Sequence, residues 1–243
     1  MKHTWIIAQR ELHTFFDSLT AYILLVLFLG FSGFFTWLFG ADVFLVGQAS
    51  LQGFFGIAYW TLFFFIPAIT MRMFAEEKRS GTIELLLTRP VTDWQIVTGK
   101  FLADFVLIAI ALALTLPYYF TVWSLGPVDH GAVWNGYLGL LLMSACYISI
   151  GLFTSSVTNN QIVALLSSLF IGIFFHLLFG LLANGLSGLP GKISGYLSLQ
   201  SHFESIARGV LDTKDIVYFL SLIFAGLFAT ELVLVRRNIT DNV

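Results

Sequence analysis

The sequence predicts an all-α integral membrane protein, a single domain over residues 1–243 with six transmembrane helices. Hydrophobic residues make up 58% of the chain and charged residues 11%, whereas soluble domains carry about a quarter charged residues. Several uncharged runs are long enough to cross the ~30 Å hydrocarbon core of a bilayer. A large share of the charges lies in one segment, Met71–Lys100, with apolar runs on both sides. We expect this segment to lie in water between two spans.

The first 18 residues predict an interfacial helix, which lies on the membrane surface. Polar side chains fall between apolar ones that recur at helical spacing. These apolar positions are Trp5, Ala8, Leu12, Phe15, Phe16 and Leu19. A cleaved signal peptide is the rival interpretation. Its charged region and its apolar run would both be too long, and no small-residue cleavage site is present, so we expect the segment in the mature protein.

Six apolar runs are predicted to span the bilayer. The stretch from His130 to Gly191 contains no Asp, Glu, Lys or Arg and is too long for one helix. The polar residues Thr154–Gln161 divide it into the fourth and fifth spans. Pro67 lies near the end of the second span, where a kink is tolerated. The other spans are Leu19–Phe39, Phe54–Met71, Phe101–Trp123 and about Ile216–Val235.

Residues Asn184–Asp215, before the sixth span, are too irregular to cross the bilayer. The first half is rich in Gly and Ser. The second half carries an amphipathic stripe, and Ser201–Glu204 has the spacing of a capping box. We expect a short interfacial or re-entrant helix here.

The distribution of Lys and Arg predicts the orientation, because cytoplasmic loops carry an excess of these residues. If the amino terminus is cytoplasmic, that side holds nine of them and the other side three. The nine are Lys2, Arg10, Arg72, Lys78, Arg79, Arg89, Lys100, Arg236 and Arg237, and the three are Lys192, Arg208 and Lys214. Both termini and the charged segment are therefore predicted to be cytoplasmic.

Motifs for catalysis or cofactor binding are missing from the sequence. It has no Walker A or His-Glu-x-x-His pattern, one cysteine (Cys146) and five scattered histidines. A net charge of −2 without a basic patch argues against nucleic acid as a partner. Gly185–Gly188 resembles the Gly-x-Ser-Gly of rhomboid proteases, but a turn is the favoured interpretation. We expect no catalytic, cofactor-binding or metal-binding residues in this chain.

Few ionisable groups lie within the predicted spans, where such groups are usually functional. Asp104 is expected to face headgroups or to pair with Lys100, and Glu231 lies near Arg236. For His176, a neutral histidine bonded to a neighbouring helix is favoured over a proton relay. This shortage of acids in mid-membrane argues against an ion-coupled transporter.

The charged segment is predicted to contain short helices. Gly81 ends the helix that arrives from the second span, and Thr82–Leu87 forms one or two turns before Arg89 and Pro90 stop it. Thr92–Gln95 has capping-box spacing and should start the next helix. A short rigid helix between two spans is suited to being moved by a partner.

Phe74–Pro90 resembles the cytoplasmic signature of permease subunits of type-2 ABC exporters. The layout is also similar, with a surface helix, six spans and a re-entrant segment before the sixth. Residues His202–Asp212 and Tyr218–Leu220 further resemble the bacterial gliding-motility (Gld) and nitrous-oxide-reductase-maturation (Nos) permeases.

The resemblance implies a two-part machine in the bacterial inner membrane. Two permease chains, identical or related, form the pathway, and two copies of a cytoplasmic ATPase bind ATP-Mg beneath them. An accessory periplasmic or membrane-anchored protein is compatible with this arrangement. Residues 82–88 match the family's coupling helix, which docks in a groove of the ATPase. The implied docking residues are Glu76, Glu77, Lys78, Arg79, Gly81, Thr82, Glu84, Leu85, Leu86, Leu87, Arg89 and Pro90.

Three alternatives stay open at this point. Glu76–Arg79 could be a solvated loop that anchors the second span. The chain could be a membrane scaffold or assembly factor that recruits an ATPase without transport. An ion-coupled carrier is the less favoured third reading. The sequence indicates no particular cargo.

Overall fold

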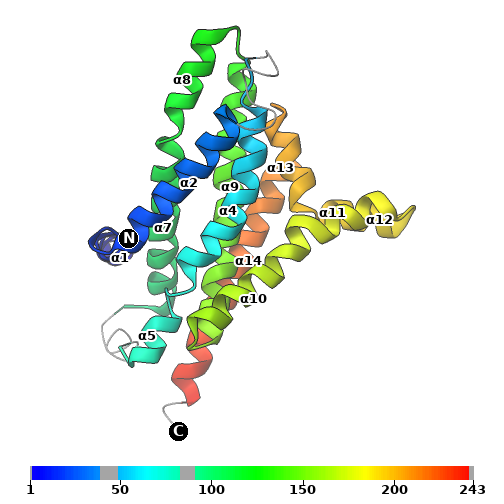
Figure 1. Ribbon diagram of the computed structural model, residues 1–243. Coiled ribbons are helices and arrows are strands. Elements are labelled where there is room, and N and C mark those ends of the chain that lie inside the picture. The colour runs from blue at the N-terminus through cyan, green and yellow to red at the C-terminus, as the bar shows by residue number, and fades with distance from the viewer. Residues whose placement is uncertain (1, 39–48, 83–90, 241–243) are drawn as a thin grey trace.

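The computed structural model describes residues 2–38, 49–82 and 91–240, and these residues form helices joined by turns and short connections (Figure 1). The elements are α1 (Lys2–Asp17), α2 (Leu19–Trp37), α4 (Gln52–Thr70), α5 (Ala75–Ser80), α7 (Asp93–Ala113), α8 (Leu116–Leu125), α9 (His130–Val157), α10 (Gln161–Ile173), the π-helical turn η1 (Phe174–Leu178), α11 (Phe179–Gly185), α12 (Leu189–Leu197), α13 (Leu199–Ala207) and α14 (Thr213–Thr240). The predicted all-α class is confirmed.

Five stretches of helix in the described chain are long and apolar enough to cross a membrane. They are Gln52–Ser80, Asp93–Leu125, His130–Val157, Gln161–Gly185 and Thr213–Arg236. A sixth is added when α1 and α2, which meet at a bend of 76°, are counted as one span. The 19 residues of α2 alone extend about 28 Å at the helical rise, close to the thickness of the hydrocarbon core. The five or six candidate spans agree with the number expected from the sequence.

The centre of the bundle is α9. It packs against α4, α7, α10, α13 and α14, and 78% of its most apolar window is buried, against 17% for α14. Small residues permit this packing. A Cβ atom on Gly151 would lie 2.0 Å from the hydroxyl of Thr70 in α4, and one on Gly226 in α14 would lie 2.5 Å from that of Ser149. The neighbouring helices therefore approach α9 at glycines.

The third span differs from the uninterrupted Phe101–Trp123 that the sequence predicted. It begins earlier, at Asp93, and it breaks between α7 and α8. Pro117 in the first turn of α8 has no N–H and disfavours a helix that continues through it. Thr115 lies at the break, where its hydroxyl donates to the carbonyl of Leu112 at 2.7 Å. As a result, α7 carries the end of the charged segment into the span as one rigid rod.

The fifth span contains a π-helical turn around His176. Its imidazole Nδ1 lies 2.6 Å from the hydroxyl of Tyr147 in α9, and its ring stacks on Tyr59 at 4.0 Å between centroids. The Tyr59 hydroxyl donates to the His176 carbonyl at 3.0 Å. His176 is thus bonded to neighbouring helices, as the favoured interpretation of this residue predicted.

The division between the fourth and fifth spans is shorter than predicted. It covers residues 158–160, because Asn160 caps α10.

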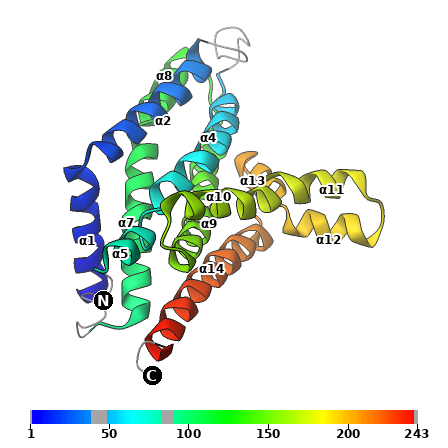
Figure 2. The same ribbon diagram turned by 60° about the horizontal axis from the view of Figure 1, so that its bottom comes forward.

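The segment before the sixth span is more regular than the sequence predicted. Its first helix, α12, folds back along α11, which is the last part of the fifth candidate span, and the two form a helical hairpin that extends away from the bundle (Figures 1 and 2). The turn expected at Gly185–Gly188 is confirmed, and Gly188 has a positive φ of 79°. The expected capping box at Ser201 is wrong: α13 begins at Leu199 because the Ser198 hydroxyl accepts from the Ser201 amide at 3.3 Å.

Candidate functional site

The turn between α4 and α5 is fixed by one serine of the central helix. The Ser155 hydroxyl accepts from the amides of Phe74 and Ala75 at 3.0 and 3.1 Å and donates to the Met71 carbonyl at 2.9 Å. α5 then ends at Gly81, whose φ of 71° is the left-handed conformation that favours glycine. The predicted helix end at Gly81 is therefore confirmed.

Within the charged segment, the next described helix, α7, starts where the sequence indicated. The Thr92 hydroxyl accepts from the Gln95 amide at 3.3 Å, and the Gln95 side chain accepts from the Thr92 amide at 3.2 Å. This reciprocal pair is a capping box, which satisfies two amides at the start of α7. The start of α7 is thus fixed by its own side chains, as the sequence predicted.

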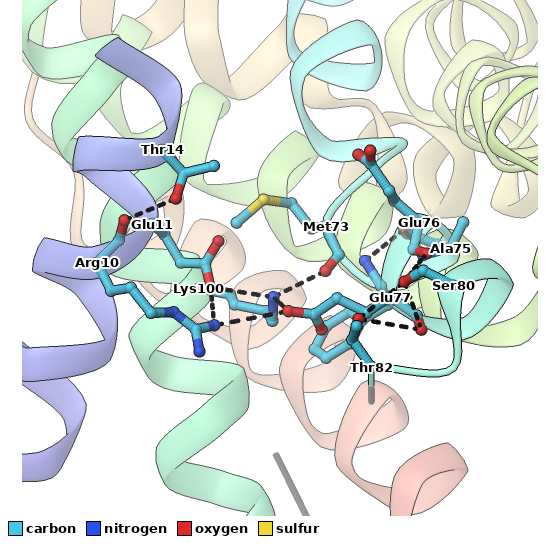
Figure 3. Close-up of polar contacts among 12 residues, drawn as sticks. Arg10, Glu11, Thr14, Met73, Ala75, Glu76, Glu77, Ser80, Thr82 and Lys100 are labelled. Atoms are coloured by element: carbon cyan, nitrogen blue, oxygen red, sulfur yellow. Dashed lines mark hydrogen bonds and ion pairs between the residues drawn. The ribbon is translucent and has the colours of Figure 1, made fainter. Parts of the chain in front are cut away.

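Four charged residues from three helices meet beside this segment (Figure 3), and we name them the Lys100 cluster: Arg10 and Glu11 of α1, Glu77 of α5 and Lys100 of α7. Lys100 Nζ donates to Glu77 Oε1 at 2.8 Å, to Glu11 Oε1 at 3.3 Å and to the Met73 carbonyl at 2.8 Å. Arg10 pairs with Glu11 and lies 3.6 Å from Glu77. The two cations and two anions of the Lys100 cluster therefore balance in charge.

The burial of Lys100 decides what this cluster contributes. The Lys100 side chain is 1% exposed, and its ammonium group lies 5.1 Å from the centre of the Phe74 ring. A buried ammonium is stable only when charged or polar partners replace its water. Lys100 therefore holds α1, α5 and α7 in one arrangement, and a displacement of any of them breaks bonds to it.

A second contact joins α5 to the bundle. The Lys78 ammonium donates to the carbonyl of Ser156 near the end of α9. Together with the Ser155 bonds, it anchors α5 to α9, the most buried candidate span among the described residues. Force applied to α5 would thus reach α1, α7 and α9 through short, directed contacts.

A cavity of about 570 Å³ opens next to the Lys100 cluster. Its lining combines the cluster with apolar and small polar side chains of α1 and of the α4–α5 turn. The lining residues are Arg10, Glu11, Thr14, Phe15, Ser18, Arg72, Met73, Glu76, Glu77, Thr82 and Lys100. Charged walls on two sides make this surface suited to polar protein contacts.

The structure separates the predicted docking residues into three groups. Glu77 and Lys78 make the internal contacts given above. Glu76, Arg79, Gly81 and Thr82 are exposed at the surface around α5. Six others lie outside the described residues: Glu84, Leu85, Leu86, Leu87, Arg89 and Pro90. Residues 75–80 form a helix instead of the loop considered for Glu76–Arg79, but the anchoring role in that interpretation is present, since Glu77 and Lys78 bond to neighbouring helices.

The predicted environment of Asp104 is wrong. Asp104 is fully buried rather than facing headgroups, and Lys100 pairs with Glu11 and Glu77 instead. Sequence reasoning also missed Arg10 and Glu11. The sequence did hold one indication: Glu11 lies at helical spacing from the apolar Ala8 and Phe15. A charged residue on that apolar face is buried together with them.

Comparison with known proteins identifies the family. A family model described as ABC-2 family transporter protein matches residues 42–235, most of the chain. The chain belongs to this family. With its membrane-spanning helices, it is a multi-pass membrane permease of the ABC transporter type.

Two curated relatives belong to strains of one bacterium. They are the probable multidrug ABC transporter permease YbhR of Escherichia coli strain K12 and its counterpart in strain O157:H7. Each is 27% identical over 120 residues, which covers 49% of this chain and 31% of the relative. The chain thus spans about a third of the length of these relatives. The whole charged segment falls within the match to the ABC-2 family.

Proposed function

We propose that this chain is the membrane-spanning subunit of an ATP-driven exporter and that a separate cytoplasmic ATPase docks on residues 76–90. The ATPase binds ATP-Mg and supplies the energy, and the permease chain has no catalytic residue of its own. A second permease chain, either another copy or a relative, completes the pathway. Membership of the ABC-2 family supports the permease role, since such subunits work with an ABC ATPase.

The observation that carries this proposal is the attachment of α5. The Lys100 cluster and Ser155 tie α5 to α1, α7 and α9. A docking helix transmits motion only if its base is rigid, because a loose loop would absorb the displacement. The exposed residues around Gly81 leave the far end of α5 open for a partner.

A pull-down tests the docking. The tagged chain is extracted from its native membrane in mild detergent, and the proteins bound to it are identified. We expect a P-loop ATPase in equal amount, and we expect Leu86→Asp to reduce it at least tenfold, because a charge replaces an apolar docking contact. The Glu77→Ala variant should weaken ATP-coupled work as well.

Leu211→Asp is the matched control, because Leu211 is 49% exposed and lies in the connection between α13 and α14, outside the proposed docking residues 76–90. It should retain the ATPase. A wild-type chain that brings down no ATPase would refute the docking role, and so would a Leu86→Asp chain that keeps a full complement.

The competing proposal is a membrane scaffold that recruits the ATPase and moves nothing. The same attachment of α5 would serve it. Cargo-dependent stimulation of ATPase activity in the isolated complex distinguishes the two, since a scaffold has no cargo to sense. An ion-coupled carrier would instead show uptake driven by a pH gradient without ATP.

We propose that both termini and the charged segment face the cytoplasm of a bacterial inner membrane. The excess of Lys and Arg on that side supports this orientation. A tag after Val243 should then be inaccessible from outside, and Ser187→Cys should react with an impermeant maleimide added to intact cells. The native Cys146 is fully buried and stays silent. The reverse labelling pattern would overturn the orientation.

We also propose membership of the gliding-motility and nitrous-oxide-reductase-maturation subgroup. This rests on the sequence of residues 202–212 and 218–220 alone. His202 in this region joins α13 to α14, since its Nδ1 lies 2.6 Å from the buried Asp215 carboxylate. The multidrug description of the curated relatives makes export the expected direction of movement.

A further inference from the structure

Asp104 in α7 is buried without a partner. Its exposure is 0%, and neither carboxylate oxygen has a hydrogen-bond donor among the described residues. A buried carboxyl group without donors costs free energy, so its retention in the span calls for a role that this arrangement does not show. Asp104 follows Lys100 by about one helical turn in α7, and Lys100 is the centre of the Lys100 cluster.

The two residues are neighbours on one face of α7. Side chains at positions i and i+4 of a helix lie about 5–6 Å apart at their Cβ atoms. Helical side chains tilt toward the N-terminus, which favours an approach of the Asp104 side chain toward Lys100. Lys100 instead extends toward α1 and α5, where it finds Glu11, Glu77 and the Met73 carbonyl.

Two of the three bonds to Lys100 come from one structural unit. Met73 and Glu77 both belong to the α4–α5 turn and α5, so a displacement of that part would remove both 2.8 Å contacts together. Lys100 would then keep only the longer 3.3 Å contact to Glu11 while it remained buried. A buried ammonium that has lost these two acceptors strongly destabilises the protein unless another acceptor takes their place.

We propose that Asp104 is the alternative partner of Lys100, which moves to it when α5 is displaced from α7. The lysine-before-acid order is the weaker arrangement of a helical pair, so Asp104 does not compete while Glu77 is present. It stabilises the displaced state and thereby reduces the free-energy difference between the two positions of α5. Asp104 acts on transport through Lys100 and is a positioning residue.

The role in transport rests on the proposed function, but the exchange of partners is a property of this chain and is tested without an ATPase. Cys146 is the single cysteine in the sequence and is fully buried, so a thiol-reactive fluorogenic dye reports thermal unfolding of the purified chain. Asp104→Asn is compared in two backgrounds, wild type and Glu11→Gln/Glu77→Gln. The second background removes both carboxylates that contact Lys100, and one of them, Glu77, is the carboxylate that a displacement of α5 would take away.

In the wild type, Asp104→Asn should change the unfolding midpoint by no more than about 2 °C, because no bond to Asp104 is lost. In the Glu11→Gln/Glu77→Gln background it should lower the midpoint by about 5 °C or more, because Lys100 loses its last carboxylate. In the single Glu77→Gln background, Asp104→Asn should also lower the midpoint, but by less. This background replaces the double variant if the double variant does not fold.

Two controls make the result specific. Asp17→Asn removes an exposed charge at the end of α1 and should have the same effect in both backgrounds. Arg72 is the other cation near Asp104, and it lies over the Phe15 ring at 4.7 Å. Adding Arg72→Gln should leave the loss caused by Asp104→Asn intact.

Three outcomes would overturn the proposal. Equal effects of Asp104→Asn in the two backgrounds would show that Asp104 does not respond to the loss of Glu77. A large loss in the wild type would show that Asp104 already has an essential partner. Disappearance of the loss in Arg72→Gln would assign Asp104 to Arg72 instead of Lys100.

Discussion

Lys100→Met is expected to lower the thermal unfolding midpoint by about 10 °C. Methionine fills a similar volume but leaves the Glu77 carboxylate and the Met73 carbonyl without their donor in a buried site. Removing one partner of a buried ion pair costs about 3–5 kcal/mol, because the other charge stays in a medium that solvates it poorly. Unfolding is followed through the buried thiol of Cys146.

A rescue distinguishes the lost charge pair from lost packing. Adding Glu77→Gln to Lys100→Met should recover part of the midpoint, since the unpaired carboxylate is gone. Lys192→Met, at an exposed position in α12, is the matched control and should shift the midpoint by less than about 2 °C. An equally small shift for Lys100→Met would mean that the cluster contributes little to holding α1, α5 and α7.

Gly151→Ala is the second substitution with a large expected effect, a loss of about 5 °C in the same measurement. The added Cβ would lie 2.0 Å from the hydroxyl and 2.7 Å from the Cβ of Thr70. The Thr70 hydroxyl already donates to the Ile66 carbonyl at 3.0 Å, and its Cβ cannot move without its backbone. The helices α4 and α9 must therefore separate at the level where the α4–α5 turn begins.

The matched control is Gly30→Ala in α2, where an added Cβ would meet no atom within 4 Å. That change should be neutral or raise the midpoint slightly, since alanine favours a helix over glycine by up to ~1 kcal/mol. If both substitutions behave alike, close approach at Gly151 does not limit the packing of α9.

Local sequence signals were enough for much of the fold. The capping box at Thr92 and the left-handed Gly81 are formed by residues within a few positions of each other, and both are confirmed. The apolar runs predicted the spans for a similar reason, since length and composition decide whether a helix can cross a bilayer. The coupling role of residues 82–88 stays a prediction.

Long-range contacts could not be predicted in the same way. Glu11 and Lys100 are 89 positions apart, and nothing in the sequence near either one indicates that α1 packs on α7. The sequence suggested Asp104 as the partner of Lys100 because it is about one turn away. In the structure Lys100 bonds to Glu77 of another helix instead. The helical hairpin of α11 and α12 was missed because Gly and Ser weaken the helical pattern.

The central position of α9 has a consequence for how the protein is made. Synthesis runs from the N-terminus, so α9 enters the membrane before α10, α13 and α14 exist. The faces of α9 that these later helices cover must meanwhile face lipid. The hydroxyls of Ser149, Thr154 and Ser156 each donate to the carbonyl three residues earlier, at 2.7, 3.0 and 2.7 Å. These bonds form within α9 and need no later helix, so these three hydroxyls are satisfied before α10, α13 and α14 arrive.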